Sequence, residues 1–193
     1  MIHKMMGCSR DHAVELDIYN RPFKEKMERI RLMKEQGNKA YQAFAQAPEK
    51  TLAAYRTALE KRQAQKDEKS ADDELEEENF LEKASYYYAQ ALLIFYYLIP
   101  ETDEEEKDSN ELKLSCHLNQ SLVFMKLERY DDCLSELDQI LSGSKGLDPG
   151  NVKALYRKAC VLELKLKYDE ALEVVESYYE RVPNKVEKDI KLF

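Results

Sequence analysis

The sequence predicts an all-helical protein, and three observations point to that class. The 193 residues include only 5 Gly and 5 Pro, which is little turn chemistry for a chain built from many strands. Charged residues make up 35% of the chain, and apolar residues recur at intervals of three and four over long segments. The helical segments also resemble one another in pairs, which is typical of a repeat architecture. The length suits one helical domain or a short repeat array.

The expected helices follow one another with short connections, except near the start. After a poorly periodic N-terminal tail at residues 1–21, a helix is predicted at about 22–47, with Pro22 in its first turn and Pro48 after its end. A strongly apolar helix is expected at 80–99, where Pro100 ends it. The remaining helices are predicted at about 108–127, 130–141, 151–166 and 168–181, with a loop at 142–150.

The segment between the first two of these helices is unusual. Residues 49–65 carry a helical pattern, whereas 66–79 are rich in charge and almost free of apolar residues, which predicts a solvated loop. Two acidic runs, 72–78 and 101–108, are also expected to be loops. Since these runs hold much of the acid, a basic groove remains compatible with the net charge of −8.

An internal repeat organises the helices into pairs. Arg-Tyr-Asp-Asp-Cys-Leu at 129–134 matches Lys-Tyr-Asp-Glu-Ala-Leu at 167–172, and each motif begins the second helix of a pair. The spacing of small and large apolar residues after Ala84 recurs after Cys133. Small residues recur where paired helices must approach closely: Gly37, Ser121 and Ala159 in first helices, and Ala84, Cys133 and Ala171 in second helices.

Five polar residues on the first helices form a candidate binding site. They are Lys34, Asn38, Asn119, Lys153 and Arg157. Lys34 and Asn38 are four residues apart, as are Lys153 and Arg157, so each pair lies on one face of its helix. Ammonium and guanidinium groups form charge-assisted hydrogen bonds to carboxylates, and an amide can donate to a carboxylate or hold a peptide backbone. Together they suit a ligand that ends in a free, acidic C-terminus.

These residues and repeats resemble the tetratricopeptide repeat (TPR) family. The resemblance covers about residues 25–184 and implies a right-handed superhelix of three helix pairs with an insertion in the first repeat and a short C-terminal helix. The implied TPR domain spans 22–184, with repeats at about 22–99, 108–142 and 151–184, an inserted segment at 49–79, and a partial capping helix at 185–193. Residues 51–59 are an alternative second helix for the first repeat, although residues 84–92 match the pattern better.

The five candidate positions also resemble the carboxylate clamp of chaperone cofactors. Lys-Glu-Gln-Gly-Asn at 34–38, Leu-Asn at 118–119 and Lys-Ala-Leu-Tyr-Arg at 153–157 match these repeats. That resemblance implies binding of the C-terminal Glu-Glu-Val-Asp peptide of 90-kDa or 70-kDa heat-shock chaperones, with Lys126 contacting the peptide upstream of its end. Leu122 and Phe124, with Met125, are expected to shape an apolar pocket beside the clamp. The Cys-His-Leu-Asn run at 116–119 resembles FKBP-type immunophilins and AIP-like proteins.

Other functional classes receive little support from the sequence. The four cysteines form no Cys-x-x-Cys pair, and the three histidines are too scattered for a metal site, so no metal or cofactor is expected. We find no nucleophile–base arrangement or phosphate loop, so no catalytic residues are assigned. Isomerase activity would need an upstream immunophilin domain. The acidic pI near 5.1 argues against nucleic-acid binding, and without a secretory pattern or a long apolar run we expect a cytoplasmic protein.

A scaffold function remains open as an alternative to the clamp. The groove or the insertion at 49–79 could bind an internal segment of another protein, which would not need a free carboxylate. A short capping helix would leave apolar surface exposed and could promote a weak homodimer.

Overall fold

The computed structural model describes residues 19–46, 53, 56–57, 79–142 and 146–181. Within these residues six α-helices occur and no strand, which confirms the all-helical class. The helices are α2 (Phe23–Gln46), α4 (Phe80–Phe95), α5 (Asp103–Lys126), α6 (Tyr130–Leu141), α7 (Val152–Leu164) and α8 (Tyr168–Arg181). Most of their bounds agree with the sequence-based ranges to within two residues; the C-terminal end of α4 and the start of α5 differ more.

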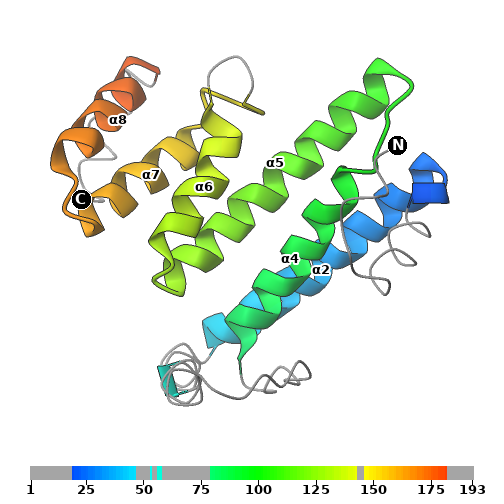
Figure 1. The fold of residues 1–193 in the computed structure, drawn as a ribbon, viewed down its shortest axis with the longest axis horizontal. Helices are drawn as coiled ribbons and strands as arrows, with labels where there is room; N and C mark the ends of the chain where they lie inside the picture. Colours follow the sequence, from blue (N-terminus) through cyan, green and yellow to red (C-terminus); the bar gives the residue numbers. More distant parts are fainter. Residues whose placement is uncertain (1–18, 47–52, 54–55, 58–78, 143–145, 182–193) are drawn as a thin grey trace, which may run out of the picture.

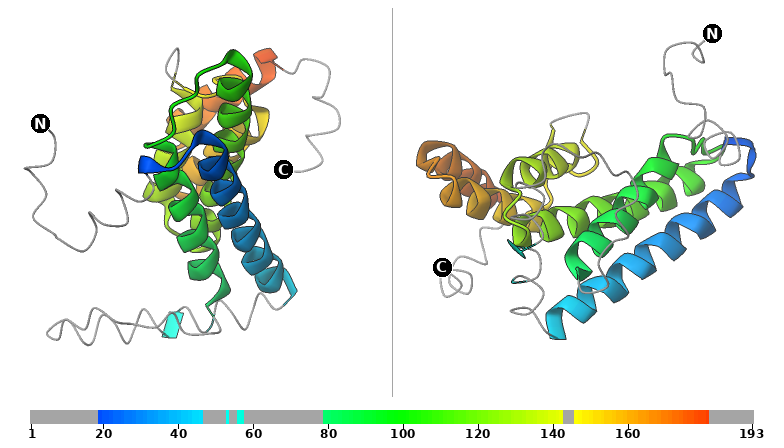
Figure 2. Two further views of the ribbon diagram at one scale, coloured as in Figure 1. Left: turned by 90° about the vertical axis from the view of Figure 1, so that its right-hand side faces the viewer. Right: turned by 60° about the horizontal axis from the view of Figure 1, so that its bottom comes forward.

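The helices pack as three neighbouring antiparallel pairs (Figure 1). The pairs are α2 with α4, α5 with α6, and α7 with α8, and each helix also contacts the next one along the chain. In addition, α5 contacts both α2 and α7, so the first helices of the three pairs are neighbours. The right-hand view in Figure 2 shows the same succession from α2 at one end to α8 at the other.

The hydrophobic core runs along this stack in two clusters. The larger one joins all three pairs through buried residues of successive helices, among them Phe44, Leu81, Val123, Leu137 and Val161. The smaller one fills the space between α2, α4 and α5 and consists of Met27, Ile30, Ala91, Ile94 and Cys116. These are the residues that recur at three- and four-residue spacing, so the apolar stripe of each helix faces its neighbours.

The turns that end α5 and α7 have the same backbone geometry. Glu128 and Leu166 each adopt a left-handed conformation with φ of 59°. The amide of Arg129 donates to the carbonyl of Phe124 at 2.9 Å, and that of Lys167 donates to Leu162 at 2.9 Å. This is the hydrogen-bond pattern of a Schellman motif. The repeated motifs at 129–134 and 167–172 therefore follow equivalent turns.

The N-terminus of α5 corrects one expectation. The acidic run 101–108 was predicted to be a loop, but α5 already begins at Asp103. Thr102 is the N-cap, and its hydroxyl accepts a hydrogen bond from the amide of Glu105 at 3.2 Å. Four acidic residues occupy the first turn, where they interact favourably with the positive end of the helix dipole. The negative charge therefore stabilises the start of a helix.

The partner of α2 is α4, which lies beside it over most of its length (Figure 1). The alternative second helix at 51–59 and the rest of the insertion lie outside the described residues, apart from positions 53, 56, 57 and 79. Arg56 forms an exposed ion pair with Glu128 at 3.1 Å. Most of the tail at 1–21 and the segment 185–193 also lie outside the described residues.

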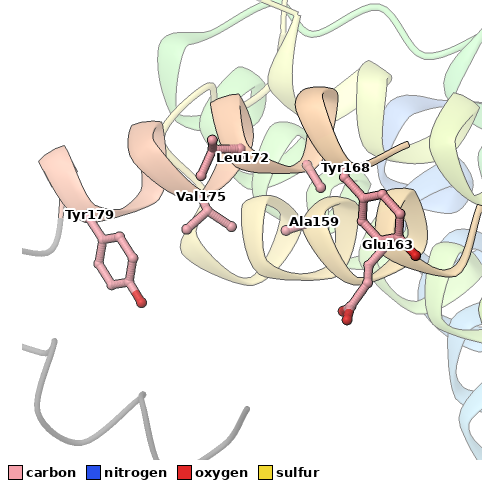
Figure 3. A pocket seen from close by; sticks show the side chains of 7 residues that line it. Ala159, Glu163, Tyr168, Leu172, Val175 and Tyr179 are labelled. Carbon is pink, nitrogen blue, oxygen red and sulfur yellow. The ribbon is translucent and has the colours of Figure 1, made fainter. Parts of the chain in front are cut away.

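The last described helix leaves an apolar surface exposed. A cavity of 380 Å³ lies between α7 and α8 and is lined by Ala159, Glu163, Tyr168, Ala171, Leu172, Val175 and Tyr179 (Figure 3). Leu172 is 58% exposed and Tyr168 is 61% exposed. Such side chains are the ones that a further packed helix or a second molecule would cover. Among the described helices, none is long and apolar enough to cross a membrane.

Candidate functional site

The five predicted clamp residues all lie on the first helices of the pairs. Lys34 and Asn38 are on α2, Asn119 is on α5, and Lys153 and Arg157 are on α7. Because α5 contacts both α2 and α7, these three helices can present side chains to a common surface. The hydrogen bonds of the individual side chains show which of the five residues are neighbours.

Asn38 and Asn119 meet directly across the α2–α5 contact. The Nδ2 of Asn119 donates to the Oδ1 of Asn38 at 3.0 Å. The hydroxyl of Tyr88, on α4, donates to the same oxygen at 2.7 Å. Three helices are therefore joined by one carbonyl oxygen, and both of its lone pairs are used. Within the described part of the chain, the Nδ2 hydrogens of Asn38 are left for a ligand.

Arg157 joins α7 to α5. Its Nη1 donates to the backbone carbonyl of Leu118 and, at 2.7 Å, to the hydroxyl of Ser121. Leu118 immediately precedes Asn119, so the guanidinium lies close to the asparagine pair. With both Nη1 hydrogens used, Nη2 and Nε remain as an edge that can donate two parallel hydrogen bonds to a carboxylate.

Burial lowers the pKa of the Arg157 guanidinium from its usual value. Desolvation disfavours the charged form, so a buried cation gains more than an exposed one from meeting an anion. Tyr41, on α2, is near enough to interact electrostatically with Arg157. The guanidinium is thus held against α5.

The two lysines differ in their surroundings. Lys34 is half-buried and electrostatically close to Cys116, which lies one turn before Asn119 on α5. Lys153 is exposed, one turn before Arg157, and within the described residues no hydrogen bond or ion pair engages its ammonium group. A hydrogen bond therefore connects Asn38 with Asn119, and Arg157 is bonded to the residue before Asn119, while Lys34 and Lys153 each lie one turn away on the same face of their helix.

The residues expected to contact the peptide side chains, Leu122, Phe124 and Lys126, differ in how accessible they are. Phe124 is only 8% exposed and belongs to the main core, with the guanidinium of Arg129 4.5 Å from its ring centroid. Leu122 is half-buried and Lys126 is exposed in the last turn of α5. Of these three residues, Lys126 is the most accessible to a ligand.

Sequence reasoning did not identify Tyr88 and Ser121 as part of the polar contacts. Both were assigned to helix packing, and both are buried. A signal for Tyr88 was present, because the equivalent positions of the second and third pairs hold the purely apolar Leu137 and Val175. A polar-tipped residue at a position that otherwise requires only packing indicates a hydrogen-bond partner nearby.

No constellation for metal binding was found in the described part of the chain. The buried His117 and the half-buried Glu136 form a pair across the α5–α6 contact, with His117 Nδ1 2.6 Å from the carboxylate. This pair lies between the two helices, and His117 is 7% exposed. Cys116 and Cys133 are buried free thiols, whereas Cys160 is half-buried.

A scan of the chain against models of known protein families finds no match.

Proposed function

We propose that this chain is a protein–protein interaction module that binds the free C-terminus of an acidic peptide. The ligand is the Glu-Glu-Val-Asp end of a 90-kDa or 70-kDa heat-shock chaperone, and the chain acts as a cytoplasmic co-chaperone adaptor without catalytic activity of its own. In this proposal the three helix pairs form a TPR superhelix. The antiparallel pairs, their equivalent turns and the neighbouring first helices support that arrangement.

The observation that carries the proposal is the convergence of Asn38, Asn119 and Arg157. Residues 38 and 119 are far apart in sequence, yet their amides are hydrogen-bonded at 3.0 Å. Arg157 donates to the carbonyl of the residue next to Asn119. Three helices thus contribute donors to one place, and a lysine lies one turn away on both α2 and α7.

This set of groups matches a carboxylate in charge and in hydrogen bonding. The site offers hydrogen-bond donors on the amides, the guanidinium and two ammonium groups. A terminal aspartate presents two carboxylates at one residue and can engage several of these donors together. Short peptides bind such sites with a Kd of roughly 1 μM, which corresponds to about −8 kcal/mol.

The proposal is tested by calorimetric titration of the chain with peptides ending in Met-Glu-Glu-Val-Asp and Ile-Glu-Glu-Val-Asp. Each peptide is used as the free acid and as the C-terminal amide. Amidation removes one negative charge and leaves the side chains unchanged, so it should abolish binding to a clamp. The affinity of the free acid should also fall with added salt, because the attraction is between charges.

Three results would be informative. Binding of the free acid alone supports the clamp, and the tighter peptide identifies the preferred chaperone class. Equal binding of acid and amide would favour a scaffold that recognises an internal segment. No binding of any peptide would contradict the proposed function.

A further inference from the structure

We infer that Tyr88 is a positioning residue that fixes the amide of Asn38 with its Nδ2 directed to the peptide carboxylate. This inference rests on the proposed function and extends it to a residue on α4, which contributes none of the five clamp positions. Tyr88 is 2% exposed and therefore acts through Asn38 without itself touching the ligand.

The hydrogen bonds determine the orientation of the Asn38 amide. An asparagine side chain has an accepting end and a donating end, and rotation by 180° about the last bond exchanges them. Tyr88 and Asn119 both donate to the Oδ1 of Asn38, at 2.7 and 3.0 Å. Rotating the amide would bring its NH2 group against these donors. A carboxylate is an acceptor, so only the observed orientation presents Asn38 as its donor.

The phenol must remain protonated to fulfil this role. Burial raises the pKa of Tyr88 above its usual value. The hydroxyl therefore keeps its proton at all physiological pH values and remains a donor. Asn119 donates to the same oxygen of Asn38, so the three side chains form one connected group.

A glycine allows the ring to come this close to α2. Gly37 precedes Asn38, and a Cβ atom at position 37 would lie 2.6 Å from Cε1 of Tyr88. The ring therefore packs directly on the α2 backbone, and its hydroxyl reaches the next side chain along the helix. In the other two pairs the positions equivalent to Tyr88 hold Leu137 and Val175, so packing alone does not require the hydroxyl.

The test removes the hydroxyl and keeps the ring. Tyr88→Phe should weaken binding of the free-acid peptide about fivefold to tenfold, because one hydrogen bond that orders the site is lost. Tyr87→Phe is the matched control, since it removes a phenolic hydroxyl from the next position of α4; its affinity should stay within about twofold of the wild type. Circular dichroism of each variant verifies the helical content.

A double-mutant cycle separates positioning from a general structural role. Asn38→Ala removes the amide that Tyr88 orients, so adding Tyr88→Phe to it should change the affinity less than about twofold. The inference would be overturned if Tyr88→Phe weakened peptide binding as much in the Asn38→Ala background as in the wild type. It would also be overturned if the Tyr88→Phe single variant bound the peptide with wild-type affinity. If the wild type binds no free-acid peptide, the proposed function fails and the inference fails with it.

The wild-type protein offers a second measurement that needs no variant. In the ¹⁵N-labelled full chain, the side-chain NH2 resonances of Asn38 should shift when the free-acid peptide is added. They should respond much less to the amidated peptide. Unchanged Asn38 resonances at saturation with the free acid would show that this amide is not a donor to the ligand.

Discussion

At the residue scale, Arg157 has two roles in the proposed site, whereas Lys153 has one. The Arg157 guanidinium binds α5 through the Leu118 carbonyl and the Ser121 hydroxyl, and it also presents an unused edge. The ammonium of Lys153 is exposed and has no partner among the described residues. Both cations should bind a carboxylate, but only the arginine also stabilises the fold.

We therefore expect the two alanine variants to differ in stability. Lys153→Ala and Arg157→Ala should each weaken peptide binding by about 1.5–3 kcal/mol, the contribution of a charged hydrogen bond. Arg157→Ala should also lower the free energy of unfolding by about 1–3 kcal/mol, since Ser121 loses its buried donor. Lys153→Ala should change the free energy of unfolding by less than about 0.5 kcal/mol.

Calorimetry measures the peptide affinity of each variant, and urea denaturation measures its free energy of unfolding. Lys39→Ala is the control, because Lys39 follows Asn38 on α2 but is exposed and pairs with Glu35 at 2.7 Å. It should affect neither quantity strongly. Equal unfolding free energies for the two test variants would contradict the structural role of Arg157.

The buried thiols give a second prediction at this scale. Burial raises the pKa of Cys116 and of Cys133 to about 12 in the folded protein. The thiolate is the reactive form, so at pH 8 both should react with a disulfide reagent more slowly than the half-buried Cys160. Mass spectrometry of the labelled peptides ranks the rates. Fastest labelling at Cys116 or Cys133 would contradict the prediction.

The same shifts predict a loss of stability in alkali. The unfolded chain releases these protons near pH 9, whereas the folded chain retains them until about pH 12. The unfolded state therefore binds fewer protons in this window, and each thiol should lower the free energy of unfolding by about 1 kcal/mol per pH unit there. Below pH 9 the contribution disappears. Cys116→Ala should reduce the slope in urea denaturation.

Residue patterns predicted that the five candidate residues lie on the first helices of the pairs, but not the contacts among them. The five residues were found from spacing and resemblance, because i,i+4 pairs on a helix are visible in the sequence. The Tyr88–Asn38–Asn119 contacts depend on the packing of three helices and on the rotamers of three side chains. Neither follows from periodicity. Phe124 was assigned to a binding pocket because an aromatic residue suits either a core or a ligand site.

At the scale of the element, α5 shows how negative charge can begin a helix. Its first turn holds Asp103, Glu104, Glu105 and Glu106, and Thr102 caps it. The sequence prediction gave more weight to the high charge of this run than to its capping signal. Thr102 with Glu105 three residues later resembles a capping box, although the Glu105 carboxylate here accepts from the amide of Glu101 at 2.9 Å.

The contribution of this cap can be measured directly. Thr102→Ala removes the acceptor for the Glu105 amide and should lower the free energy of unfolding by about 1 kcal/mol. Ser135→Ala, at an exposed position within α6, is the control and should be neutral or slightly stabilising. Urea denaturation compares the two. A Thr102→Ala variant as stable as the wild type would show that the start of α5 does not depend on its cap.

The boundaries of other helices were easier to predict because several sequence features indicate the same residues. In α6 and α8 the apolar spacing, the preceding turn and the repeated motif all indicate the same boundaries, and the observed starts are Tyr130 and Tyr168 as expected. The pairing of α2 with α4 depended on matching a repeat across a long insertion. That insertion has no counterpart in the second and third pairs, so the repeat could not assign it a structure.

At the scale of the whole molecule, the α8 end of the stack carries exposed apolar side chains. The α8 end exposes Leu172 and Tyr168 beside the α7–α8 cavity. We expect this surface to support weak self-association, opposed by the net charge of −8. Sedimentation velocity should show a concentration-dependent increase in the sedimentation coefficient that is larger in high salt. Leu172→Glu should remove it, while Glu173→Gln, at the adjacent exposed position, should not.

A single unchanging species over the whole concentration range would contradict this prediction. Leu172 is not one of the five proposed clamp residues, so peptide affinity should be the same in Leu172→Glu and in the wild type. Comparing this variant with the wild type in the peptide titration therefore separates self-association from ligand binding.

The paired left-handed turns also have a practical consequence for protein engineering. Glu128 and Leu166 occupy a conformation in which a side chain is disfavoured and glycine is free of that cost. Replacing either residue by glycine should raise the midpoint of thermal unfolding, with a gain of up to about 1 kcal/mol per turn. The gain should be clearer at Leu166, because Glu128 would also lose its exposed pairing with Arg56. Because the two turns are equivalent, glycine can be introduced at both to make the protein more heat-resistant.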